Sequence, residues 1–226
     1  MPEARLWLLL GRYYKKKYQV VVNTNLQIAL KERDLFRLGH YNLVRSDYYF
    51  VNTNNKRSLE NINKSTTLFR KVNSRDDLCE ALLKKSIILC ELGQPKKARR
   101  YIKQAWNIYE QIHCEYLLPQ LLLAKGMVER LNGKDEAIET LREALKVSKK
   151  QLTREQTWQI QREMALYYKD KRQFKRALKY YKDAVETIKQ ITESIPTEEI
   201  KLSYLEVPFR KRVFDEIKEL KKLIVK

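Results

Sequence analysis

Apolar and small residues recur along this 226-residue chain at the three- and four-residue spacing of amphipathic helices. The stretch RQFKRALKYYKDAVETI, residues 172–188, places Phe174, Ala177, Tyr181 and Ala184 on one face of such a helix. Alternating small and bulky residues let two helices interlock at close range. The pattern therefore predicts a helix that packs tightly against a neighbour.

The same triplet of small, bulky and small residues returns at a nearly constant interval. Its first member is Ser58, Ala98, Ala137 or Ala177, and these markers lie 40, 39 and 40 residues apart. A second helix precedes each marked helix, across a turn that contains Gly, Asn or Pro, such as residues 93–95. The interval therefore predicts repeated helical hairpins.

The expected fold is all-α, since only 5 Gly and 5 Pro occur and sheet proteins need many turns. The N-terminal unit fits the pattern less tightly and requires a shorter turn. Pro208 suits the start of a final helix, which we expect to cap the array. The predicted units are about 4–36, 39–73, 78–113, 118–150 and 157–192, then a linker, 194–207, and a capping helix, 208–226.

The hairpin pattern resembles the tetratricopeptide repeat (TPR) family. The resemblance rests on a small residue followed by a bulky one on the first helix, as in Ala165 and Tyr168, and on the triplet of the second helix. The usual repeat has about 34 residues, so an interval near 40 is similar to the longer-helix variety of bacterial multidomain signalling and regulatory proteins. The resemblance implies a right-handed superhelical solenoid with one continuous core.

In that family the first helix of each hairpin lines a concave groove that binds a partner protein or peptide. Here Leu83, Ile87, Leu123 and Met127 stand where a polar carboxylate clamp would be expected, so a clamp is disfavoured. An apolar centre with basic ends favours an amphipathic partner with acidic flanks. Alternatively, some of these side chains pack against a facing repeat or the capping helix. The candidate groove residues are Leu8, Arg12, Lys15, Leu43, Asp47, Phe50, Leu83, Ile87, Leu123, Met127, Arg130, Arg162, Leu166 and Lys169.

The formal net charge is +19, and residues 1–100 hold most of it, with 21 Lys and Arg against 9 Asp and Glu (21 − 9 = +12). Such a field attracts acidic or phosphate-bearing partners, or it belongs to a solvated lysine-rich surface. Nucleic acid, RNA in particular, is the alternative ligand, through the basic clusters at 15–17, 96–100 and 169–176. A homodimer through stacked ends is a third alternative.

The sequence offers little for catalysis. The two histidines, His40 and His113, have no carboxylate or Cys at a sequence spacing typical of a catalytic pair. No glycine-rich phosphate-binding loop occurs. The three cysteines are not spaced as a zinc site or a disulfide framework, so we expect buried or half-buried thiols. We therefore predict no enzyme, cofactor or metal. No run of 18 apolar residues occurs, and a cytoplasmic role in signal transduction or transcription is expected.

Overall fold

The computed structural model describes residues 15–225, and Leu8 and Arg12 lie outside this range. The described residues form eleven α-helices and one short 3-10 helix, and they contain no strand. The expected all-α fold is confirmed. The chain forms two compact units, of which the first comprises residues up to Cys114 together with 197–209, and the second comprises 115–196 and 210 onward.

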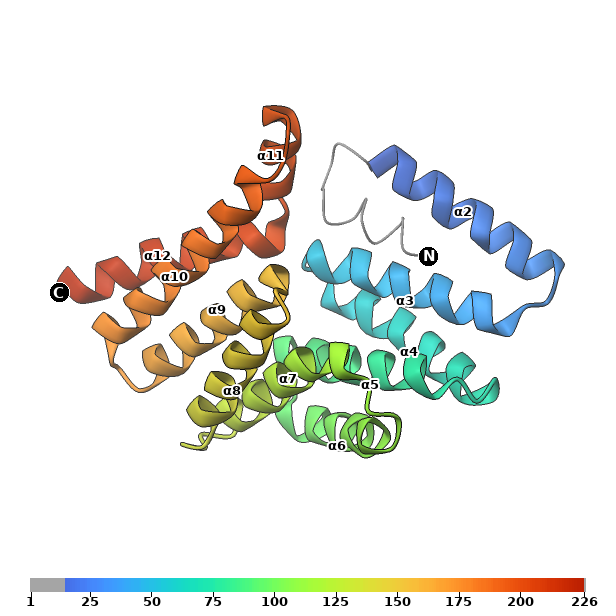
Figure 1. Ribbon diagram of the computed structural model, residues 1–226, viewed down its shortest axis with the longest axis horizontal. Helices are drawn as coiled ribbons and strands as arrows, with labels where there is room; N and C mark the ends of the chain where they lie inside the picture. The colour runs from blue at the N-terminus through green and yellow to red at the C-terminus, as the bar shows by residue number, and fades with distance from the viewer. Residues whose placement is uncertain (1–14, 226) are drawn as a thin grey trace. The chain divides into compact units, whose positions relative to one another are not determined.

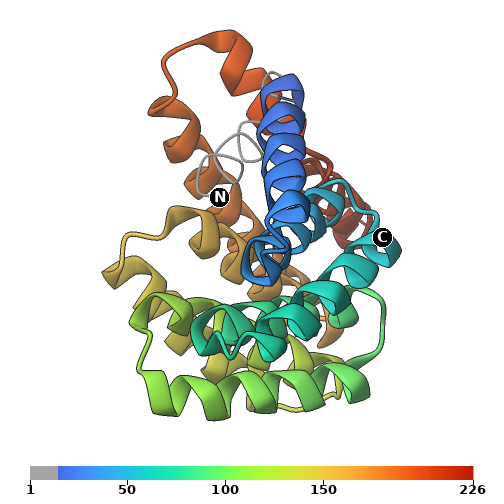
Figure 2. The same cartoon turned by 90° about the vertical axis from the view of Figure 1, so that its right-hand side faces the viewer.

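In the first unit each helix packs on the next one along the chain. Both views show this order, from α2 in blue to α6 in green (Figures 1 and 2). Hairpins α3–α4 and α5–α6 correspond to the second and third predicted units. The helices of this unit are α2 (Lys15–Lys31), α3 (Leu35–Val51), α4 (Asn55–Lys71), α5 (Arg75–Glu91), α6 (Pro95–Ile112) and α11 (Glu198–Leu205).

In the second unit the two hairpins α7–α8 and α9–α10 stack, and their first helices α7 and α9 are also in contact. The segment expected to be a linker contains α11, and the next helix begins at Pro208, as expected. The unit boundaries read from the sequence otherwise remain predictions. The helices of this unit are a 3-10 turn (Glu115–Leu117), α7 (Leu118–Leu131), α8 (Ala137–Lys150), α9 (Arg154–Asp170), α10 (Phe174–Glu193) and, from Arg210, α12 (Pro208–Val225).

The N-terminal unit, expected at 4–36 as a hairpin with a short turn, is described only from Lys15 onward. Residues 15–31 form the single uninterrupted helix α2, so Lys15 begins a helix that precedes α3 directly. The polar side chain of Asn25 does not end this helix, because its amide donates to the carbonyl of Val21 at 2.8 Å. Hydrogen bonding to the carbonyl four residues back lets an Asn remain inside a helix.

The helices end in left-handed turns that recur almost every twenty residues. In most of them the residue after the left-handed one also closes back on the helix, as where Thr53 N–H donates to Phe50 O at 2.8 Å and Asn54 N–H to Tyr49 O at 2.8 Å. This pair of bonds is the Schellman motif. Two twenty-residue helix-and-turn segments account for the interval near 40. The left-handed residues are Arg33, Thr53, Asn73, Gly93, His113, Gly133, Leu152 and Arg172.

Thr53 is strained in its turn, because its φ is 60° and a branched Cβ crowds the backbone there. The side chain is exposed and would lose no packing on truncation. Thr53→Gly is expected to raise the free energy of unfolding by about 1 kcal/mol, measured by thermal or urea unfolding. Thr67→Gly, at an exposed position inside α4, is the control and should lower it. A loss of stability in Thr53→Gly would contradict the strain.

The small marker residues hold the two helices of each hairpin close together. Ser46 and Ser58 bond reciprocally, each hydroxyl donating to the other's carbonyl, at 3.0 and 2.9 Å. A Cβ on Gly126 would lie 2.6 Å from the Leu141 side chain. The markers Ser58, Ala98, Ala137 and Ala177 are fully buried, so their interpretation as packing residues is confirmed.

Candidate partner-binding surfaces

The two helices of a hairpin differ in how much of their surface is free. Nine residues of α5 are buried, whereas only Ala98, Ile102 and Ala105 are buried on α6. In the second unit α9 buries ten residues and α10 five. In these two hairpins the first helix is thus enclosed on most sides and the second helix keeps a broad polar face, whereas α3 and α4 bury five residues each.

One row of the candidate groove residues lies in the core. Leu43 and Leu83 are 0% exposed, Leu123 is 3% exposed and Arg162 is 5% exposed. Each of them precedes the small residue of its helix by three positions, and residues three apart share a face of a helix. The small residue faces the second helix of the hairpin, so this row is buried with it. In this conformation these four side chains are not accessible to a partner.

Two further groove candidates in the first unit contact other parts of that unit. The carboxylate of Asp47 on α3 accepts two hydrogen bonds from Lys84 on α5, at 2.7 and 2.6 Å. The ring of Phe50 lies 5.0 Å, between centroids, from the ring of Phe209 in the C-terminal segment. For Phe50 the structure therefore favours the alternative in which groove residues pack against the end of the chain.

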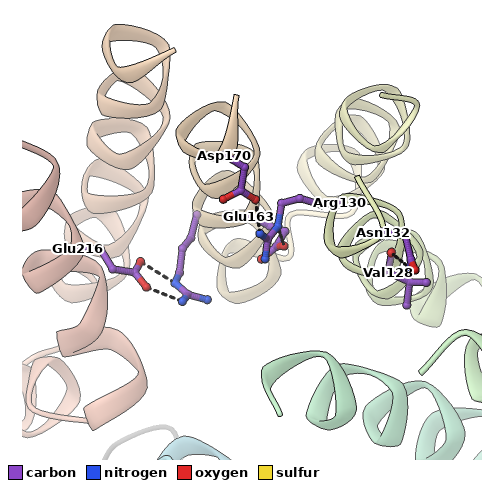
Figure 3. A network of polar contacts seen from close by, with 7 residues as sticks. Val128, Arg130, Asn132, Glu163, Asp170 and Glu216 are labelled. Carbon is purple, nitrogen blue, oxygen red and sulfur yellow. Dashed lines mark hydrogen bonds and ion pairs between the residues drawn. The ribbon is translucent and has the colours of Figure 1, made fainter. Parts of the chain in front are cut away.

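In the second unit Arg130 joins the two first helices (Figure 3). Its guanidinium, on α7, donates to Glu163 at 2.5 Å and to Asp170 at 2.6 Å, both on α9. Burial lowers the pKa of Arg130, but the charge and hydrogen bonds of the two carboxylates outweigh it and the pKa is raised. Arg130 thus remains charged and aligns α7 with α9.

Arg162 joins α9 to α12 by a bidentate pair, with its Nε 2.9 Å and its Nη2 2.6 Å from the two carboxylate oxygens of Glu216 (Figure 3). A second contact, from Arg210 Nη2 to Glu155 Oε1 at 3.2 Å, joins the same two helices. Burial raises the pKa of Tyr181 on α10, and the nearby Glu216 raises it further. These contacts join α12 to α9 within the second unit, and its role as a cap stays a prediction.

Of the remaining groove candidates, three keep part of their side chain in solvent. Ile87 lies on α5 in the first unit, and Leu166 and Lys169 lie on α9 in the second; all three are half-buried. Met127 is 5% exposed. Phe50 is half-buried as well, but its ring packs on Phe209, so Ile87, Leu166 and Lys169 are the candidates that we consider for direct contact with a partner.

The basic clusters found in the sequence lie in different surroundings. In 169–176, Lys171 pairs with Asp135 at 2.5 Å and Arg176 lies over the ring of Tyr168. Tyr167 and Tyr168 are buried, so neither ring is available to stack on a nucleic-acid base. The cluster at 96–100 belongs to α6, and its charged side chains are exposed.

The described residues contain little that resembles a reaction centre. Burial, and then the nearby Cys114, raise the pKa of the Cys79 thiol to about 12, which keeps it protonated and poorly nucleophilic. All three cysteines are free; Cys79 and Cys90 are buried and Cys114 is half-buried, as expected. Residues 15–225 hold no group of three acidic, His or Cys side chains placed to bind a metal. None of the described helices has the length and apolar character that a bilayer crossing requires.

No protein-family profile matches the sequence, and no curated protein matches it either. A crystal structure from Podosopora anserina, described as a putative kinesin light chain with nearly identical TPR-like repeats, is similar in fold. The match has a TM-score of 0.52 and 17% sequence identity, and it covers 85% of this chain and 97% of that one. At this identity the likeness concerns the fold alone.

Within each unit, antiparallel hairpins stack on one another, which is the packing of an α-helical solenoid. The small-residue contacts inside the hairpins and the likeness to the solved repeats identify this solenoid as the TPR-like kind.

Proposed function

We propose that the chain is a protein–protein interaction scaffold or regulatory module, without catalysis of its own, that acts in signal transduction or transcription control. The TPR-like stacking of hairpins carries this proposal, because hairpins that stack within a unit build a continuous binding surface. The pathway rests on the resemblance to long-repeat regulatory proteins and is an analogy of fold.

The accessible groove candidates indicate the chemistry of the partner. Leu166 and Lys169 lie three residues apart on α9, so they share one face of that helix, an apolar side chain beside a cation. In the first unit Ile87 offers a half-buried apolar side chain on α5. Such faces suit an amphipathic segment whose apolar side chains dock and whose acidic side chains pair with lysine.

The test compares partners captured by the wild-type chain and by the double variant Leu166→Glu with Lys169→Glu. We expect the enrichment of partners on this variant to be at least about tenfold lower than on the wild-type chain, because each change adds repulsion against an acidic segment. Enrichment is measured by quantitative mass spectrometry, and circular dichroism verifies helicity.

The matched control is Leu178→Glu with Lys182→Glu, a half-buried Leu and an exposed Lys on the second helix of the same hairpin. It changes the charge by the same amount and should keep the partners. Partners that stay bound to the α9 variant, or that leave both variants alike, would contradict the groove proposal.

A further inference from the structure

The second helices α4 and α6 carry most of the exposed positive charge among the first unit's side chains whose burial the structure describes. Each of α4 and α6 has five cations and one acid, so the two helices together carry ten cations and two acids. All ten cations are exposed, and none forms an ion pair with another described residue. They are Lys56, Arg57, Lys64, Arg70 and Lys71 on α4, and Lys96, Lys97, Arg99, Arg100 and Lys103 on α6.

The cations lie on the faces opposite the core. On α6 the residues Lys96, Arg100 and Lys103 share one face, three or four positions apart, and Ala98, Ile102 and Ala105 form the buried side. The same division holds on α4. Both helices pack on α5 with their buried sides. At 1.5 Å per residue, the cations of α4 extend over about 22 Å of that helix, and those of α6 are gathered in about 10 Å of its amino-terminal half.

The neighbouring acids do not neutralise these rows. On the first helices Asp47 and Glu80 are bound to Lys84, and Asp77 lies 3.3 Å from His40. The first turns of α4 and α6 contain no acid and include Lys56 and Lys96. The amino end of a helix is already positive, so cations there cost helix stability and add to the local field.

The composition of these faces favours a polymer of phosphates over a protein partner. No exposed large apolar side chain lies on α4 or α6, although such side chains occur on other described helices. Protein interfaces are built around apolar and aromatic anchors and exclude lysine from their centres. A phosphate backbone is bound by cations alone.

The faces also lack a platform for bases. The aromatic side chains of α6 are half-buried, with Tyr101 lying beneath Lys85 at 3.8 Å and Trp106 packing against Tyr109. Single-strand binders stack bases on exposed aromatic rings. We propose that the outer faces of α4 and α6 bind the phosphate backbone of nucleic acid without reading its bases. This goes beyond the proposed groove binding and uses different helices.

The test measures binding of the full chain to labelled short duplexes of RNA and of DNA by fluorescence anisotropy. If about five phosphates are contacted, affinity should fall on the order of 10²- to 10³-fold between about 50 and 200 mM salt. The affinity at a given salt concentration should be the same for duplexes of unrelated base sequence. The comparison of the two duplexes identifies which nucleic acid supplies the phosphates.

The variant Lys96→Gln, Arg100→Gln, Lys103→Gln removes one row of α6 and should lower the slope of log affinity against log salt by about 3. The matched control, Lys175→Gln, Lys179→Gln, Lys182→Gln, removes three exposed cations from α10 and should leave the slope unchanged. All six positions are exposed, so thermal unfolding should show both variants folded.

Four results would overturn the proposal. The first is no binding to either duplex at about 50 mM salt, and the second is an equal decrease of the salt slope in the two variants. The third is binding of polyglutamate as tight as that of the duplexes, and the fourth is tighter binding of phosphatidylserine vesicles than of the duplexes. The third would assign the rows to an acidic protein segment and the fourth to a membrane surface.

Discussion

Leu83→Glu is expected to lower the free energy of unfolding of the first unit by about 4 kcal/mol or more at neutral pH. Leu83 is 0% exposed, so a carboxylate at this position would be buried away from water among apolar side chains. A whole domain is stable by only about 5–15 kcal/mol. Urea unfolding followed by circular dichroism measures the loss.

Ile87→Glu is the matched control, one helical turn further along α5 at a half-buried position. It places the same charge on the same helix but leaves it in contact with water, so the loss should be much smaller. If Leu83→Glu keeps wild-type stability and only abolishes partner binding, Leu83 faces a groove and its assignment to the core is wrong.

Arg162→Ala should lower the free energy of unfolding of the second unit by about 3 kcal/mol. The change leaves the carboxylate of Glu216, 17% exposed on its side chain, without its bidentate partner. Removing one member of a buried ion pair costs more than the pair contributes, because the other charge stays in a poor solvent. Chemical denaturation of the purified variant gives the value.

The double variant Arg162→Met with Glu216→Leu separates the cost of leaving Glu216 unpaired from the net contribution of the ion pair to stability. It replaces both charges by apolar side chains and should return close to wild-type stability. Lys201→Ala is a surface control, since its partner Glu198 is 79% exposed, and it should change stability by less than about 1 kcal/mol. A loss of that small size in Arg162→Ala would show that α12 does not depend on this pair.

The repeat was predictable from the sequence because its signal is local. Small residues such as Ala98 and Ala137 must occur where two helices touch, and their interval reports the hairpin directly. The left-handed turns were less evident, since Thr53 and Leu152 are residue types that disfavour positive φ. Gly93 and Gly133, and less strongly Asn73 and His113, are residue types that favour positive φ and so indicate a turn.

The candidate groove was harder to predict because helical periodicity gives a face but not the neighbour that covers it. Leu43 and Leu83 have the same spacing whether they face a groove or the next hairpin. Arg162 finds its partner Glu216 54 positions away, on a helix outside the repeat pattern. No local feature of the sequence marks such a pair.

The regular turns also constrain how the chain can change in length. Thr53 and Gly93 are equivalent turn positions two helices apart, and so are Gly93 and Gly133. After loss or duplication of one such 40-residue stretch, every later helix would still be the first or the second helix of its hairpin, as before. After loss of a single helix and its turn, each later first helix would take the place of a second helix, and each second helix that of a first helix. The array is therefore suited to evolve by gain and loss of complete hairpins.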